Sequence, residues 1–372
     1  MAMPSTSSSG PLDKFKGKII GHPILMTAFQ QVLDLIEEPA DVEVAAVIGP
    51  TGAGKSTLVA RVKQAVLKQN LTAMQADIGL VPVIAVDAPA PELGNFNWRE
   101  MYLRILVALK EPACDWQIAL KEMPSGKAGV TRLASLNHLE LKARVESAFR
   151  HRGVKVLLID EAQHLGKMAS GRRLQDQTDI LKSLAKITGT FVVLVGTYDL
   201  IPLLQLNGQV ARRFASIHLP RYQCDRPDEW HNFQTVIRSL ESGILLPAQP
   251  DLVRSAEMLY RGSAGCVGIL KSWLTAAYSR VLRSDGNELS NNVLKATCLP
   301  TLSIRKIIEE IGAGEDHWAR SHAEDKELDR LLGLSKFQPA APAPLVPPAR
   351  RTVPVGMRKP TRDPVGLEVA AA

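Results

Sequence analysis

The sequence lacks the marks of secreted, membrane-spanning and zinc-binding proteins. Its four cysteines, Cys114, Cys224, Cys266 and Cys298, have no C-x-x-C spacing, which argues against a zinc site and against a disulfide framework. No apolar run approaches the length that spans a membrane, and the short Ser-rich N-terminus has no apolar signal core. We therefore expect a reducing, cytoplasmic compartment and no membrane association.

What remains is a globular composition with an excess of positive charge. Of the 372 residues, 45% are hydrophobic and 22% are charged, and the formal net charge is +7. This length is enough for one large domain or two ordinary ones. The charge makes an anionic partner reasonable, nucleic acid above all, although charge alone does not identify one.

The strongest motif is a glycine-rich turn between a predicted strand (44–48) and a predicted helix (57–67). In this context the pattern G-x-x-x-x-G-K-[ST] predicts a phosphate-binding loop. Glycines let backbone N–H groups approach a phosphate closely, and the helix N-terminus adds its positive dipole end. The residues expected to bind a nucleoside triphosphate are Gly49, Pro50, Thr51, Gly52, Ala53, Gly54, Lys55, Ser56 and Thr57. Lys55 is expected to contact the β- and γ-phosphates, and the Ser56 hydroxyl to be a magnesium ligand.

A second apolar stretch (154–159) ends in two carboxylates, Asp160 and Glu161. In a parallel α/β sheet the ligand lies at the carboxyl ends of the strands, so these acids should lie near the phosphate loop. Asp160 is then predicted to hold magnesium opposite Ser56, directly or through water. Glu161 is predicted to polarise the water that attacks the γ-phosphate. The alternative is a pair of surface acids that only end a strand.

Two further candidates follow along the chain. Thr197 stands just after the predicted strand 191–195, where it could sense the γ-phosphate or orient the water; the alternative is a simple turn residue. Arg212 and Arg213 precede the predicted strand 216–219 and could act in trans as an arginine finger on a neighbour's ATP. A surface pair that serves only solubility is the competing interpretation.

The order of the elements predicts an α/β domain followed by a helical one. Strands and helices alternate at first, and from Pro227 onward the pattern is helical. We predict a mostly parallel sheet sandwiched by helices over 18–225 and a small helical domain over 226–315. Residues 1–17 are predicted to be a disordered N-terminus, and 316–372 an extended, Pro-rich basic tail that is largely disordered. Pro82 indicates an edge position for the predicted strand 80–86.

Two stretches are open to two interpretations. Gly21-His22-Pro23 precedes a predicted helix (25–36) and is either a turn or a place for an adenine base. The irregular stretch 111–136 carries Lys121, Lys127 and Arg132, which are either solvated surface, the simpler view, or a contact to a polyanion.

These motifs occur in the order seen in AAA+ ATPases. Within that class the chain resembles the TnsC/TniB family of transposition regulators, which is related to the Mu B protein. The resemblance covers about residues 20–310 and is carried by the segments 48–57, 158–165, 194–200 and 211–214. It implies an AAA+ P-loop NTPase fold with a helical lid, ATP and Mg²⁺ as cofactors, and hydrolysis of ATP to ADP and phosphate.

The resemblance also implies partners. Such proteins form a homo-oligomeric ring or helical filament on double-stranded DNA, receive a signal from a target-selection protein and activate a transposase, and ATP hydrolysis drives disassembly. Loops facing the ring's interior contact DNA; here these would include Lys121, Lys127 and Arg132, together with Arg172 and Arg173. No base-reading motif is evident, so we expect backbone contacts and little sequence preference. Two alternatives stay open: a secretion-associated ATPase resembling ExeA, in which Asp-Glu-Ala-Gln also occurs, and a signalling NTPase switch without DNA binding.

One departure from the class concerns the lid. AAA+ lids often carry a second sensor arginine in a Gly-Asp-x-Arg pattern, whereas this chain reads Gly262-Ser-Ala-Gly265. Arg261 and Lys271 are nearby substitutes, but neither is in register. The sequence therefore does not identify the residue that would couple nucleotide to lid movement.

Overall fold

The computed structural model describes residues 10–91, 96–110, 136–166, 172–206, 212–284, 286–322 and 330–332. The described residues up to His322 belong to one compact unit, which contains a parallel sheet and a set of helices that follows it. Among the described residues, no helix has the length and apolar character needed to cross a bilayer.

The sheet has five parallel strands in the order β2-β3-β4-β1-β5. The strands are β1 (Val44–Ile48), β2 (Val83–Asp87), β3 (Val156–Asp160), β4 (Phe191–Gly196) and β5 (Phe214–His218). Ile48, the last residue of β1, is in register with Gly196 of β4 and with His218 of β5. The chain that follows β1 therefore leaves the sheet between two neighbouring strands. Pro82 directly precedes β2, and β2 is an edge strand, as its proline predicts.

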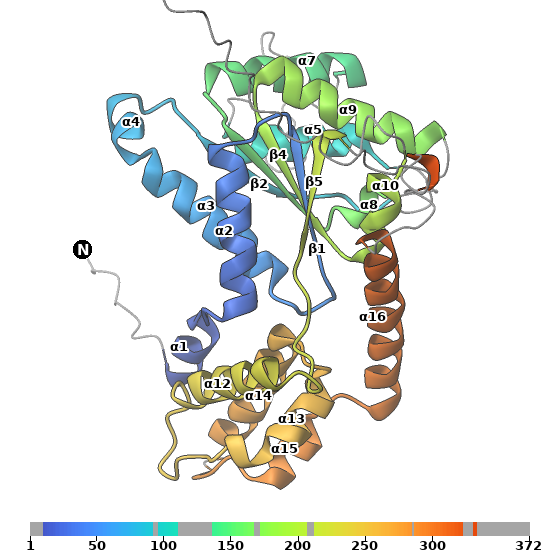
Figure 1. Cartoon of the computed structure of the whole chain (residues 1–372). Helices are drawn as coiled ribbons and strands as arrows, with labels where there is room; N and C mark the ends of the chain where they lie inside the picture. The colour runs from blue at the N-terminus through green and yellow to red at the C-terminus, as the bar shows by residue number, and fades with distance from the viewer. Residues whose placement is uncertain are drawn as a thin grey trace, which may run out of the picture. The chain divides into compact units, whose positions relative to one another are not determined.

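Helices cover both faces of the sheet (Figure 1). Along β1, Val44 and Ile48 pack into one buried cluster and Ala45 and Val47 into the other, which is the alternation expected of a strand buried on both faces. One face carries α2 (Pro23–Glu37) and α3 (Lys55–Gln69), and the other carries α5 (Trp98–Ala108), α7 (His138–His151) and α9 (Arg172–Thr188). The start of α7 has a capping box, in which Asn137 and Glu140 satisfy each other's backbone N–H groups. Shorter helices are α4 (Leu71–Ala76), α8 (Gln163–Gly166), η2 (Tyr198–Leu200) and α10 (Ile201–Leu204).

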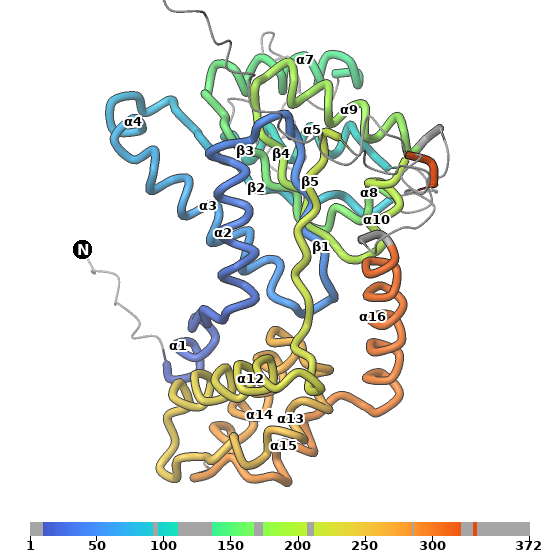
Figure 2. The backbone as a smooth tube through the Cα atoms, viewed as in Figure 1, coloured from blue at the N-terminus to red at the C-terminus, as the bar shows by residue number. Residues whose placement is uncertain are grey.

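The helical part follows β5 through a segment that runs directly from the sheet into α12, as the tube in Figure 2 shows. Its elements are α12 (Pro227–Glu241), η3 (Val253–Ser255), α13 (Ala256–Ser263), α14 (Val267–Arg283) and α15 (Asn291–Thr297). The core of this part is a separate buried cluster centred on aromatic residues such as Phe233, Trp273 and Tyr278.

The N-terminal segment departs from the predicted disorder. Pro11–Gly17 forms helix α1, and Phe15 is buried in the core of the helical part with its ring edge-on to Tyr278 at 5.7 Å. Phe15 and the partly buried Leu12 pack on this core, and Lys271 donates to the carbonyl oxygens of Lys16 and Lys18, so tertiary contacts hold a helix too short to be stable alone. The predicted boundary at residue 17 is therefore wrong for residues 11–17, while residues 1–9 lie outside the described range.

The last helix also departs from the predicted boundary at residue 315. Helix α16 runs from Thr301 to His322 and contacts η2 of the α/β part. Gly314 allows this approach, since a Cβ there would lie 2.1 Å from the Tyr198 ring. Helix α16 is thus a strap between the helical part and the end of β4, whereas residues 333–372 of the predicted tail lie outside the described range.

Candidate nucleotide-binding site

The glycine-rich loop has the backbone that its sequence predicts. Gly52 and Gly54 have φ angles of 80° and 106°, in the left-handed region that residues with a Cβ avoid. Helix α3 begins at Lys55, so the N-terminal end of its dipole faces the loop. Gly49 serves packing, because a Cβ there would lie 2.1 Å from the Leu219 carbonyl oxygen. The loop fits a phosphate group, whose oxygens take up converging backbone N–H groups.

Lys55 is held inside this loop. Its side-chain Nζ donates to the carbonyl oxygens of Gly49 at 3.0 Å and of Pro50 at 2.8 Å, and the residue is only 7% exposed. Burial lowers the pKa of Lys55, and the charges of Glu161 and Asp160 act in the opposite direction. The ammonium group is thus kept at the phosphate loop, within the field of two carboxylates.

The two predicted magnesium ligands are in direct contact. The Ser56 hydroxyl donates to Asp160 Oδ2 at 2.8 Å, and Asp160 Oδ1 accepts the backbone N–H of Glu161 at 2.8 Å. A hydroxyl and a carboxylate are hard oxygen donors of the kind that Mg²⁺ takes alongside phosphate oxygens and water. The described residues contain no group of three or more His, Cys, Asp or Glu side chains that could hold a metal ion, so a magnesium ion here would take its further ligands from phosphate oxygens and water.

Glu161 lies beside them in an unusual backbone conformation. Its φ angle is 53°, a left-handed value that costs free energy in a residue with a Cβ and that recurs at functional sites. Glu161 Oε2 accepts the side-chain amide of Gln163 at 2.5 Å, and Gln163 Oε1 accepts the backbone N–H of Thr197 at 3.1 Å. Gln163 therefore links the end of β3 to the end of β4. Gln163 is not among the predicted site residues; its signal in the sequence is its place at the end of the Asp-Glu-Ala-Gln segment, three residues after Asp160.

A pocket of about 640 Å³ connects these groups with helix α14. Its walls include loop residues 51–57 apart from Ala53, the side chains of Glu161 and Thr197, and residues of α14 from Gly268 to Ala276. The Gly268 N–H donates to the Gly52 carbonyl at 2.7 Å, and a Cβ on either glycine would clash with the other segment. The phosphate loop and the first turn of α14 are therefore in backbone contact.

The twin arginines lie at the other edge of the sheet. Arg212 and Arg213 directly precede β5, whereas the phosphate loop follows the carboxyl end of β1, which is parallel to β5. Arg212 pairs with Asp41 at 2.8 Å and Arg213 with Glu43 at 2.7 Å. Neither arginine can reach the phosphate loop of its own chain from there, so a role in hydrolysis requires a second copy.

The other predicted contacts fall elsewhere. Lys121, Lys127 and Arg132 lie outside the described residues, and Arg172 and Arg173 are the first two residues of α9. His22 is buried, and its Nδ1 lies 3.0 Å from the Tyr222 hydroxyl, while both interpretations of Gly21-His22-Pro23, a turn and a place for an adenine base, stay predictions. Lys271 donates to the carbonyl oxygens of Lys16 and Lys18 at the end of α1, so it holds α1 in place. Arg261 lines a different pocket, between α13 and α16.

Comparison with known proteins agrees with the fold class. Residues 42–204 match the family model described as an AAA domain. A comparison with curated proteins gives no match. Together with the parallel sheet, its helical layers and its phosphate loop, the family match gives the chain the predicted AAA+ P-loop NTPase fold.

Three examples of solved structures of similar fold are archaeal proteins. The chain is similar to the Walker-type ATPase of Pyrococcus abyssi, with 16% identity over 79% of this chain and 75% of that one and a TM-score of 0.45. It is also similar to the ORC2 protein of Aeropyrum pernix in ADPNP and ADP complexes, with 15% identity over 76% of this chain and 70% of that one and a TM-score of 0.48. The ORC1 protein of the same organism, in complex with DNA, has 17% identity over 75% of this chain and 65% of that one, with a TM-score of 0.48. At TM-scores below 0.5 these likenesses carry no argument about what this chain binds.

Proposed function

We propose that the chain is a magnesium-dependent ATPase that assembles on duplex DNA. The hydrogen bond of Ser56 with Asp160 is the main support for ATP hydrolysis, because it lies beside the phosphate loop that also binds the Lys55 side chain. One hydroxyl, one carboxylate and one ammonium at this edge of the sheet are the set that P-loop enzymes use on a triphosphate.

The roles of the residues follow from their chemistry. Backbone N–H groups of residues 52–56 and the Lys55 ammonium would bind the β- and γ-phosphates. Ser56 and Asp160 would hold Mg²⁺, which, when bound, neutralises charge that develops on the phosphates. Glu161 would accept a hydrogen bond from the attacking water and draw its proton, and Thr197 would orient that water or the γ-phosphate.

The DNA-binding part rests on other support. The net charge of +7 favours a polyanionic partner, and the resemblance to the TnsC/TniB family supplies the biological role: an oligomer on target DNA that receives a target-selection protein and activates a transposase. The position of Arg212 and Arg213 at the far edge of the sheet supports this assembly, because arginine fingers supplied by a neighbour need such a position.

The test measures DNA binding and ATP hydrolysis in the same variants. With ATP and Mg²⁺, the wild type should bind duplex DNA and Glu161→Gln should remain bound, whereas Lys55→Ala should bind neither ATP nor DNA. Raising salt should weaken DNA binding steeply, because phosphate contacts release counterions. Lys63→Ala, an exchange on the same helix α3 outside the pocket, is the matched control.

Two results would contradict the proposal in different ways. DNA affinity that does not depend on ATP would contradict ATP-dependent assembly on DNA, and an ATPase that binds no DNA at all would agree with the ExeA-like and signalling alternatives. A wild type that binds no nucleotide would remove the ATPase role as well.

A further inference from the structure

A groove in the helical part has no place in the roles given above. Its volume is about 840 Å³, and it lies between α13, α14, the end of α15 and the first turns of α16. In Figure 1, α13, α14 and α15 are packed together, and α16 leads from them toward the sheet. We call this space the α13–α16 groove.

The floor of the α13–α16 groove is apolar and preformed. Trp273 is 5% exposed, and its indole Nε1 donates to the Leu294 carbonyl at 2.9 Å, which fixes the ring. Met258, which packs on the same core, and Leu299, which is 41% exposed, extend the apolar surface. Trp273 and Leu299 also line the nucleotide pocket, whereas Ile308 lines this groove and neither of the two pockets at the phosphate loop. Substitution of Ile308 therefore tests the groove separately from the nucleotide site.

The first half of helix α16 carries two apolar stripes with different surroundings. Ile307 and Ile311 belong to a small buried cluster with Cys266. Ile304 and Ile308, one turn apart, line the groove instead. Neither of these two belongs to a buried cluster of the described residues, and Ile308 is 41% exposed. Large apolar side chains that stay open in a concave surface are typical of an interaction site.

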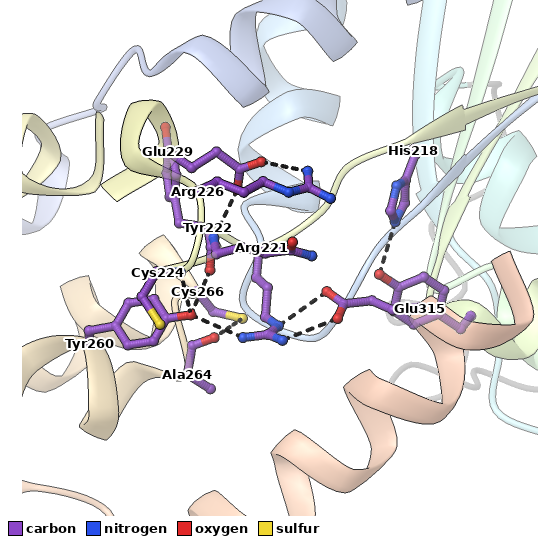
Figure 3. Close-up of polar contacts among 12 residues, drawn as sticks. His218, Arg221, Tyr222, Cys224, Arg226, Glu229, Tyr260, Ala264, Cys266 and Glu315 are labelled. Atoms are coloured by element: carbon purple, nitrogen blue, oxygen red, sulfur yellow. Dashed lines mark hydrogen bonds and ion pairs between the residues drawn. The ribbon is translucent and has the colours of Figure 1, made fainter. Parts of the chain in front are cut away.

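The second half of α16 is held at the sheet. Arg221 Nε and Nη2 donate to the two carboxylate oxygens of Glu315 at 3.1 and 3.2 Å, as Figure 3 shows. About one turn further on, the Trp318 ring stacks on His218 of β5 with centroids 4.6 Å apart. These contacts fix the direction of the helix, so the wall that carries Ile308 stands in place with its apolar stripe open.

The rim of the groove is positively charged. Arg261 on α13, Lys295 on α15 and Arg305 on α16 are exposed lining residues, and Glu309 is the one acid that lines the groove with them. None of the three cations has an ion pair or a hydrogen bond with another residue that the structure describes. Three cations from three helices around an apolar floor complement a segment that carries both acids and apolar side chains.

Two other occupants fit this surface less well. The phosphate backbone of a nucleic acid would match the cations, but it has no apolar side chains with which to cover Ile304 and Ile308. A second copy of this chain carries the same excess of positive charge, +7 in all, which opposes its docking on a cationic rim. Charge and apolar surface together favour an acidic partner protein.

We propose that the α13–α16 groove is the docking site of a partner protein, which inserts apolar side chains of an acidic segment between α13 and α16. The apolar side chains cover Ile304 and Ile308, and the carboxylates pair with Arg261, Lys295 and Arg305. An apolar groove with a charged rim recognises a short segment in this way, because apolar burial supplies affinity and the charges supply specificity. The inference goes beyond ATP hydrolysis and needs no nucleotide.

The experiment selects a display library of random peptides on the full chain without nucleotide. Enriched peptides should combine large apolar residues with several acids. Ile308→Ser and Arg305→Glu should each weaken binding of the enriched peptide about tenfold. The controls are Leu302→Ser, a residue of α16 that is 76% exposed and lies outside the groove, and Lys306→Glu, the exposed neighbour of Arg305. Both should bind the peptide as the wild type does.

A charge exchange gives a second readout that loss of folding cannot imitate. The enriched peptide with lysine in place of each acid should bind the double variant Arg261→Glu/Arg305→Glu more tightly than it binds the wild type, because the charges are again complementary. Equal affinity of the lysine peptide for the two proteins would overturn the inference.

Three further results would also overturn it. One is a library without enriched peptides, or with peptides that Ile308→Ser binds as tightly as the wild type does. Another is a loss of duplex DNA binding in Arg305→Glu with peptide binding unchanged, which would assign the cations to nucleic acid. The third is a loss of self-association in Ile308→Ser, measured by sedimentation, with no peptide enriched, which would assign the groove to a second copy. A chain that binds no ATP would refute the ATPase proposal and leave this inference standing.

Discussion

Gln163 holds Glu161 by a hydrogen bond of 2.5 Å from its side-chain amide to the glutamate carboxylate. Gln163 is 7% exposed, and its own carbonyl is bonded to the Thr197 backbone, so the amide cannot turn without breaking a second bond. The proposed proton acceptor is therefore oriented by a buried residue that itself has no acid–base chemistry.

Replacing Gln163 with Leu should slow ATP hydrolysis about 10- to 100-fold and leave nucleotide affinity nearly unchanged, because a misplaced acceptor costs rate more than binding. Steady-state hydrolysis and a binding titration check this. Gln175→Leu, an exposed glutamine on α9, is the control. A parallel loss of nucleotide affinity would show that Gln163 supports the loop as a whole.

Arg212 and Arg213 differ in how firmly they are held. The Arg212 and Asp41 side chains are both 76% exposed, whereas Arg213 and Glu43 are 44% and 25% exposed. An exposed ion pair contributes little stability, so Arg212 is the freer of the two to reach a neighbouring chain.

Arg212→Ala and Glu161→Gln should each abolish hydrolysis by the assembled protein, and an equal mixture should regain it at about a quarter of the sites, where an intact Glu161 meets an intact arginine of the neighbour. Hydrolysis rates of mixtures at several ratios check this. A mixture that stays inactive would place Arg212 outside the neighbour's site.

Stability should fall in mild acid because of His22. Burial, and to a smaller extent the charge of Arg61, lower the pKa of His22 from 6.5 to about 4. The unfolded chain then binds a proton at a higher pH than the folded one, so stability is complete above pH 6.5 and is lost as the pH falls from there toward 4. At pH 5 the loss is about 2 kcal/mol.

Urea unfolding at pH 8 and at pH 5 measures this loss. His22→Gln should reduce the difference between the two values, whereas His231→Gln, an exposed histidine on α12, should leave it unchanged. Equal pH dependence in the wild type and in His22→Gln would mean that another group titrates.

Phe15 should anchor α1 to the helical part. The side chain is 1% exposed and contacts Tyr278, so Phe15→Ala should destabilise the protein by about 3–5 kcal/mol. Lys14→Ala, its exposed neighbour on the same helix, should have little effect. Melting temperatures and amide exchange of α1 separate a local release of this helix from a global loss of stability.

The features that the sequence predicts well are local. Strand, glycine turn and helix follow one another at residues 44–69. An apolar run that ends in Asp160 and Glu161 predicts a place for these acids near the phosphate loop, because the carboxyl ends of parallel strands lie at the same edge of the sheet. Backbone rules then explain Gly52 and Gly54, whose positive φ angles come from the loop itself.

The features that it does not predict depend on partners far along the chain. Gln163 is recognised only when Thr197 lies beside it, and Arg221 only when α16 brings Glu315 against it. The order of Pro11–Gly17 depends on the packing of Phe15 into the core of the distant helical part, and in the sequence these seven residues, with few apolar side chains, resemble a disordered end. Arg212 and Arg213 are identified as a pair by sequence, but only the strand directions show which edge they occupy.

The bond from the Gly268 N–H to the Gly52 carbonyl joins two main-chain atoms and leaves no room for a Cβ on either side. Mutation cannot adjust such a link by degrees, because no side chain takes part in it and the smallest possible addition, one methyl group, pushes the two segments apart. Descendants of this protein therefore keep both glycines or lose the link at once. An engineer who wants the helical part released from the phosphate loop needs to add a single carbon atom at position 268.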